Sequence, residues 1–209
     1  MPDTSHNTPF IEPRLRYKPG VVDLGRPATF EDLDIYPEGL AVELIDGLME
    51  IQPQPTNRHR FLQSRLNLML NAIFDDGVGK LDGWLIMFEP EIRLEARALV
   101  PDVAGWRKDR AAHFSEIAHA DVAPDWLCEI LSPSTAKRDR TTKMDQYAAW
   151  GVQNMWIIDP ELRTLESYRL VSDKWLLVKT YDDKGSVHIE PVLDAELDLD
   201  ELWNLPFKK

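Results

Sequence analysis

The amino-acid sequence predicts one α/β domain in which a mixed β-sheet is flanked by helices. Three observations lead to this fold class. Asp46-Gly47 joins two apolar runs, as in a hairpin with a type I′ turn. Apolar residues recur at helical spacing over residues 57–74. An apolar strand, a helix and a second apolar strand then follow one another over residues 126–159.

The elements of the first third follow from local signals. Residues 1–26 are Pro-rich and are expected to form a mobile arm, which leaves 27–209 as a single domain. Thr29 is the expected N-cap of a short helix that ends before Pro37. The hairpin spans 40–53. The stripe of the helix over 57–74 consists of Phe61, Leu62, Leu66, Met69, Leu70 and Ile73.

The rest of the chain alternates strands with one further helix. Two long β runs, 84–95 and 98–108, flank the link Ala96-Arg97 and predict a second hairpin. Residues 107–123 are loosely helical or loop. A helix over 139–150 is closed by Gly151, and a strand at 154–159 is stopped by Pro160. A meander of antiparallel strands is expected over 164–183 and 186–193, before a last short helix at 198–203.

Composition limits the function classes. A hydrophobic content of 44% fits a globular chain, and no apolar run is long enough to span a membrane. The single cysteine, Cys128, fits a reducing cytoplasm, and we interpret it as a core residue. The formal net charge of −12 disfavours a protein that relies on non-specific phosphate contacts. Action on nucleic acid remains open if positive charge is local or if carboxylates hold a metal ion.

Three acids stand in apolar strands. Glu129 has Leu127 and Leu131 as its neighbours on the same strand face. Asp102 and Glu43 have similarly apolar surroundings. Carboxylates from separate strands could meet at one sheet edge and share Mg²⁺, which prefers oxygen ligands. The competing interpretation is that each acid pairs with an arginine or caps a turn.

The position of Lys143 favours the interpretation in which the three acids share one site. It lies on the helix that follows the strand of Glu129, on the same face as Tyr147 and Trp150. That helix should pack back on the sheet, so its first turns overlie the end of the strand that carries Glu129. A lysine there can face the carboxylates, although a lysine stem lying over apolar surface is also common.

Four phrases carry a resemblance to a known family: VELIDGLMEI, VPDVAGW, CEILSPSTAKRDRTTKMDQYAAWGV and MWIIDP. They resemble the Uma-two family of restriction endonucleases, within the PD-(D/E)XK nuclease superfamily. The resemblance covers about residues 28–180 and implies a restriction-endonuclease-like core with added antiparallel hairpins. The superfamily lysine usually stands two residues after the glutamate, where this chain has Leu131. Lys143, on the following helix, matches it instead.

The resemblance implies a site and an activity. Asp102 and Glu129 would be metal ligands, Lys143 would orient water and steady the phosphate, and Glu43 would be an additional acid holding metal or water. The implied cofactor is Mg²⁺, with Mn²⁺ as a substitute, and the implied reaction is hydrolysis of DNA phosphodiesters by an endonuclease. His59 is more simply a structural histidine, Gln146 a solvated side chain, and Arg138 and Arg140 a solvated face.

Other functions stay open from sequence alone. The chain could be a non-catalytic module that binds nucleic acid or protein on the same fold, or a hydrolase of another phosphodiester. DNA is the expected partner, no membrane partner is expected, and a homodimer is a further expectation because the strand-rich second half offers sheet edges.

Overall fold

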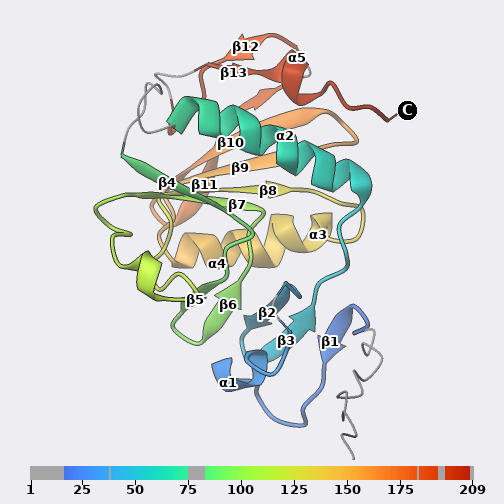
Figure 1. Ribbon diagram of the computed structural model, residues 1–209, viewed down its shortest axis with the longest axis vertical. Coiled ribbons are helices and arrows are strands. Elements are labelled where there is room, and N and C mark those ends of the chain that lie inside the picture. Colours follow the sequence, from blue (N-terminus) through green and yellow to red (C-terminus); the bar gives the residue numbers. More distant parts are fainter. Residues whose placement is uncertain (1–16, 38, 75–82, 183, 193–195, 208–209) are drawn as a thin grey trace, which may run out of the picture.

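The computed structural model describes residues 17–37, 39–74, 83–182, 184–192 and 196–207. Its largest sheet has six strands in the order β11-β10-β9-β8-β7-β4 (Figure 1). β8 and β9 pair in parallel, and the other neighbours pair antiparallel, so the predicted mixed sheet is confirmed. The six strands are β4 (Trp84–Phe88), β7 (Val103–Arg107), β8 (Trp126–Ile130), β9 (Asn154–Asp159), β10 (Thr164–Val171) and β11 (Lys174–Tyr181).

Helices cover both faces of this sheet, as the sequence predicts. Helix α2 (Asn57–Phe74) packs its leucines against Trp126, Cys128 and Ile130 of β8, and α5 (Leu199–Leu202) joins the same core. On the opposite face, Leu127 of β8 packs with Tyr147. That face is covered by one helical stretch in three parts: α3 (Ala136–Arg138), a π-helical turn η2 (Asp139–Lys143) and α4 (Met144–Ala149).

A second sheet lies beside the first (Figure 1) and has the strand order β1-β3-β2-β6-β5. Its strands are β1 (Gly20–Val22), β2 (Val42–Ile45), β3 (Leu48–Ile51), β5 (Ile92–Leu94) and β6 (Arg97–Leu99). The predicted hairpin is β2–β3, with Asp46 and Gly47 at φ 52° and 78° as a type I′ turn requires. Helix α1 (Phe30–Leu33) follows Thr29, the predicted N-cap.

The two long β runs are each broken, which the sequence analysis did not predict. Glu89 adopts a left-handed φ of 49° ahead of Pro90, and this separates β4 from β5. Pro101 and Asp102 similarly separate β6 from β7. The predicted hairpin therefore exists as β5–β6 in one sheet, while β4 and β7 pair in the other. Each run bends from one sheet into the next.

The remaining predictions have mixed outcomes. The meander is confirmed for β10 and β11 but not beyond, because β12 (Ser186–Val187) pairs instead with β13 (Leu197–Asp198). The last helix is confirmed as α5, and the stretch before β8 contains the short 3₁₀ turn η1 (Phe114–Glu116). Residues 1–16 of the expected arm lie outside the described residues, and residues 20–22 of it form β1. Within the described part of the chain, no helix has the length and apolarity that a membrane span needs.

Candidate functional site

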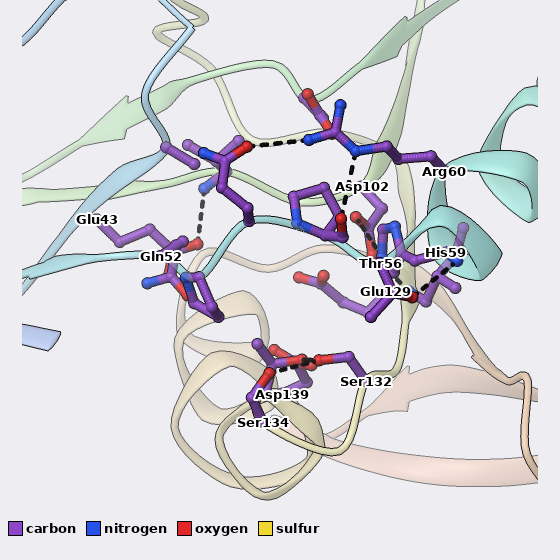
Figure 2. Close-up of a pocket in the computed structure, with 18 of the residues that line it drawn as sticks. Glu43, Gln52, Thr56, His59, Arg60, Asp102, Glu129, Ser132, Ser134 and Asp139 are labelled. Carbon is purple, nitrogen blue, oxygen red and sulfur yellow. Dashed lines mark hydrogen bonds and ion pairs between the residues drawn. The ribbon is translucent and has the colours of Figure 1, made fainter. Parts of the chain in front are cut away.

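A cavity of about 430 Å³ opens where the two sheets meet. Its wall combines the end of β8, the segment before β7, the first turn of α2, strand β2 and the turn η2. Figure 2 shows the side chains of Asp102, Glu129 and Asp139 around this space. Its acidic lining residues are Glu43, Glu89, Asp102, Glu129 and Asp139, and its basic ones are His59, Arg60 and Lys143.

Glu129 is buried at the centre of this wall, with a relative exposure of 2%. Strand alternation turns Cys128 and Ile130 toward α2, so Glu129 faces the helical stretch that contains η2 and α4. Two groups from that stretch hold its Oε1 atom: Lys143 Nζ at 2.6 Å and the hydroxyl of Tyr147, which donates a hydrogen bond of 2.6 Å. The carboxylate in the apolar strand therefore has both a cation and a neutral donor opposite it.

Lys143 is also buried, at 5% exposure, and its ammonium group links several elements. Besides Glu129, Nζ lies 3.2 Å from Glu43 Oε1 and 3.9 Å from Asp139 Oδ1, and it donates to the carbonyl of Val100 at 3.2 Å. Burial disfavours the ammonium charge, but the surrounding carboxylates outweigh this and raise the pKa of Lys143 well above its usual value. The lysine is a fixed positive charge at the cavity wall.

Glu43 is engaged on both carboxylate oxygens. Its Oε1 accepts from the backbone N–H of Val100 at 3.0 Å and contacts Lys143, while its Oε2 pairs with Arg138. Arg138 also lies 3.1 Å from Glu50 Oε2 on the neighbouring strand. From the sequence, Glu43 is expected to hold metal or water, and this role stays a prediction. In the structure, its contacts tie β2 to Lys143 and Arg138.

Asp102 enters the cavity from a different direction. Its Oδ2 accepts from the backbone N–H of Ile130 at 2.6 Å, which anchors it beside Glu129, and its Oδ1 lies 3.1 Å from His59 Nε2. The carboxylate is 16% exposed, in contrast to Glu43 at 1%. Asp102 also helps to raise the pKa of Glu129 by repulsion, so the two carboxylates act on one another across the wall.

Two residues in this site were not assigned a functional place from sequence. Asp139 is 4% exposed in η2, and burial, with repulsion from Asp102 and Glu43, raises its pKa against the effect of Lys143. Its spacing of four residues from Lys143 was the available signal. His59 was interpreted as structural, yet it contacts Asp102. The pKa of His59 is lowered by burial but raised more by Asp102, with a net upward shift.

Other candidates from the sequence lie outside this arrangement. Arg140 forms an ion pair with Glu166 and is absent from the cavity wall. Gln146 does not line the cavity either, and its Oε1 is buried rather than solvated. Cys128 is fully buried in the core, where burial raises the pKa of its thiol well above the usual value, as expected of a packing residue.

Five acidic and three basic side chains line this cavity among the described residues. Burial raises the pKa of Glu129 to about 8, with Lys143 opposing that shift and Asp139 and Asp102 adding to it. Such a wall of carboxylates offers the hard oxygen donors that divalent cations prefer. Among the described residues, however, no three His, Cys, Asp or Glu side chains are grouped as a protein-only metal site would need. A cation here would draw further ligands from water or from a bound substrate.

The fold defines the class of protein as restriction-endonuclease-like. Its structure is similar to the crystal structure of a "putative nuclease" from Anabaena variabilis, with a TM-score of 0.68 and 25% sequence identity. The match covers 85% of this chain and 98% of that one. The predicted mixed α/β fold class is thereby confirmed.

A match over most of the sequence establishes the family of this chain. Residues 27–201 match the model of the Uma2 (Uma-two) family, whose description is "Putative restriction endonuclease". The chain belongs to this family, so the resemblance inferred from the four phrases is confirmed. No curated protein matches the chain.

Proposed function

We propose that this protein is a metal-dependent endonuclease that hydrolyses phosphodiester bonds in DNA. The observation that carries the proposal is the buried Lys143 ammonium, 2.6 Å from Glu129 Oε1, on the wall of a cavity that also contains Asp102. Desolvation of a buried lysine is costly, so its pairing with carboxylates contributes little net stability, and groups with perturbed pKa values in a cleft are candidates for a functional site. Membership of an endonuclease family supports the same reaction.

We assign the cation to Asp102 and Glu129, as Mg²⁺ with Mn²⁺ as a substitute. The donor set fits, because Mg²⁺ is commonly held by one or two carboxylates with water and substrate phosphate completing its shell. When bound, the ion activates water and neutralises charge that builds up on the phosphate. The raised pKa of Glu129 supports this assignment, because a bound cation would favour the carboxylate against both burial and the repulsion from Asp139 and Asp102.

The protein's own residues supply the remaining steps. Lys143 provides a fixed positive charge near the phosphate oxygens, where negative charge increases in the transition state. Tyr147 and Glu43 hold the lysine and its partner Glu129 in one geometry through their contacts. Asp102 and Glu129 orient the water that attacks in line with the leaving oxygen. Contacts with neighbouring elements fix the side chains of Asp102, Glu129 and Lys143, so these groups are positioned before substrate binds.

DNA cleavage by the Glu129→Gln variant tests the proposal. The amide keeps the size of the side chain but cannot supply a carboxylate to the cation, so nicking of supercoiled plasmid in Mg²⁺ should fall by about 10²-fold or more. The matched control is Glu166→Gln, which removes a carboxylate paired with Arg140 outside the cavity and should cleave normally. Wild-type rates in Glu129→Gln, or cleavage that persists in a chelator, would contradict the proposal.

The same assay separates the alternatives. A non-catalytic binding module would retain plasmid without nicking it in any metal. A hydrolase of a small phosphodiester would cleave a chromogenic diester but leave plasmid intact. Replacing plasmid with an RNA of similar length tests the choice of DNA directly, since preference for RNA would keep the chemistry and change the substrate.

A further inference from the structure

His59 has a position that a structural histidine does not require. It lies in the first turn of α2 with 7% exposure, and its Nε2 is 3.1 Å from Asp102 Oδ1. The other ring nitrogen, Nδ1, is buried without a hydrogen-bond partner among the described residues. A buried nitrogen left unsatisfied is costly, so packing alone would favour an apolar residue at this position. An apolar residue would lose the contact of the ring with Asp102 and its interaction with the backbone of Ile130.

The two oxygens of Asp102 are thereby fixed from two elements. The backbone N–H of Ile130, in β8, donates to Oδ2 at 2.6 Å, and His59, in α2, lies against Oδ1. Contacts on both oxygens restrict rotation of the carboxylate about its terminal bond. Its remaining lone pairs are left to the cavity, whose wall contains both His59 and Asp102 (Figure 2).

We propose that His59 is a positioning residue that holds the Asp102 carboxylate in the orientation that binds the divalent cation. The inference rests on the proposed function, because it assumes that Asp102 is a cation ligand. Mg²⁺ demands near-octahedral geometry, so the direction of each carboxylate lone pair affects its affinity. Groups that orient a ligand from behind commonly change metal affinity by 10–100-fold when they are replaced.

The experiment measures Mn²⁺ binding to the substrate-free protein by calorimetry, beside thermal unfolding. His59→Leu removes the polar contact and should weaken Mn²⁺ binding by about 10–100-fold while the protein still unfolds cooperatively. His59→Gln places an amide donor near the position of Nε2 and should recover much of the affinity. The matched control is His113→Leu, which removes an exposed histidine paired with Asp121 at 2.6 Å, away from the cavity. It should bind Mn²⁺ as the wild type does.

A purely structural histidine gives a different pattern. His59→Leu would then change the unfolding temperature and leave the Mn²⁺ affinity at the wild-type value, which overturns the inference. Should His59→Leu fail to fold, His59→Gln and His59→Asn decide. Tighter Mn²⁺ binding by His59→Gln than by His59→Asn supports a donor at the Nε2 position, and equal affinity in the two variants overturns the inference. Raising the Mg²⁺ concentration should also restore DNA cleavage by His59→Leu, because the defect lies in affinity.

Failure of the inference and failure of the proposed function are distinguishable. Asp102→Asn should abolish most Mn²⁺ binding. A wild-type protein that binds no Mn²⁺, or binds it equally well after Asp102→Asn, overturns the assignment of the cation and the role of His59 with it. Mn²⁺ binding that depends on Asp102 but not on His59 overturns the role of His59 alone.

Discussion

The carboxylate of Glu129 is surrounded by apolar strand residues, and its position is stable only because other polar groups are buried with it. Lys143 and Tyr147 both contact the same oxygen, Oε1. Desolvation of the two charges offsets much of their attraction, so such a pair contributes little net stability while the loss of one partner is costly. The attraction between Lys143 and Glu129, set against their desolvation, explains how a carboxyl group can be kept in the core.

The pH dependence of stability should report the burial of Glu129. Its pKa is about 8 in the folded protein against 4.5 ordinarily, so the folded state binds a proton more tightly than the unfolded state. The stabilisation from this proton is complete below the unfolded value and is lost as the pH rises through about 8. The free energy of unfolding, measured in urea, should therefore fall between about pH 5 and about pH 8.5. Glu129→Gln should make the free energy of unfolding less dependent on pH over this range. An unchanged dependence on pH would show that it does not come from Glu129.

Removing the lysine should destabilise the fold. Lys143→Met leaves Glu129, Glu43 and Asp139 without their shared cation, and the expected loss is about 3–5 kcal/mol of unfolding free energy. Adding Glu129→Gln to Lys143→Met should recover part of that loss, because the amide carries no charge and does not have to take up a proton when the lysine is absent. Urea unfolding of the two single variants and the double variant measures this coupling. Strictly additive effects would show that the two side chains do not interact.

Sequence reasoning located some of these residues and missed others for physical reasons. Glu129 and Lys143 could be selected because an acid in an apolar strand requires a partner, and the next helix could supply one. Asp139 looks like an ordinary helical surface acid, and its burial depends on how η2 packs. The neighbour of His59 is Asp102, which lies 43 residues later in the segment between β6 and β7. No local pattern encodes that contact. The catalytic and metal roles remain predictions.

At the scale of elements, the π-helical turn η2 positions the helical side of the site. Asp139 and Lys143 are the buried residues of this turn, and both line the cavity. π-helical turns occur mostly as single-turn insertions and are frequent at functional sites. The periodicity of residues 139–150 predicts a helix there but cannot distinguish a π-helical turn, which differs from an α-helical turn by a single residue.

The β2–β3 hairpin, which carries Glu43, turns at Gly47, where the backbone lies close to Pro27. A Cβ at Gly47 would lie 3.0 Å from Pro27 Cβ, and the glycine has φ of 78°, so Gly47→Ala should cost about 1–2 kcal/mol of unfolding free energy. Gly25→Ala is the matched control, since Gly25 has φ of 67° and a Cβ added there would have no atom within 4 Å. A loss in Gly47→Ala no greater than in Gly25→Ala would mean that the contact with Pro27 is unimportant.

Hairpin and helix signals were sufficient to predict β2–β3 and α2, because a two-residue turn and a long apolar stripe are local features. The division of residues 84–108 between two sheets was not predicted. Strand-forming residues continue past both bends, and the bends depend on Glu89 in a left-handed conformation and on Pro101. Nothing in alternation alone indicates which sheet a strand joins.

At the scale of the molecule, the site lies between the two sheets of an acidic protein. The formal net charge is −12, and the basic residues on the cavity wall are His59, Arg60 and the buried Lys143. Long-range attraction of duplex DNA is therefore expected to be weak, and the proposed metal ion would supply much of the local positive charge. The edge strand β11 exposes Leu176, Leu177 and Val178. A homodimer through such an edge stays a prediction.

The salt dependence of DNA binding should reflect this charge distribution. If about two phosphates are contacted, affinity should fall only about 10-fold as salt rises from about 50 to about 200 mM. Fluorescence anisotropy with Glu129→Gln, which should bind without cleaving, measures the slope. A fall of about 10³-fold or more over the same range would indicate many phosphate contacts, as in a dedicated duplex-binding module.

The most direct test of the account is the location of Mn²⁺ by anomalous diffraction from crystals soaked in that metal. We predict that carboxylate oxygens of Asp102 and Glu129 bind one and the same Mn²⁺ ion, and that the Lys143 ammonium remains in contact with Glu129. An ion bound elsewhere, or a cavity without anomalous signal in crystals of protein that cleaves DNA in Mn²⁺, would contradict the proposed site.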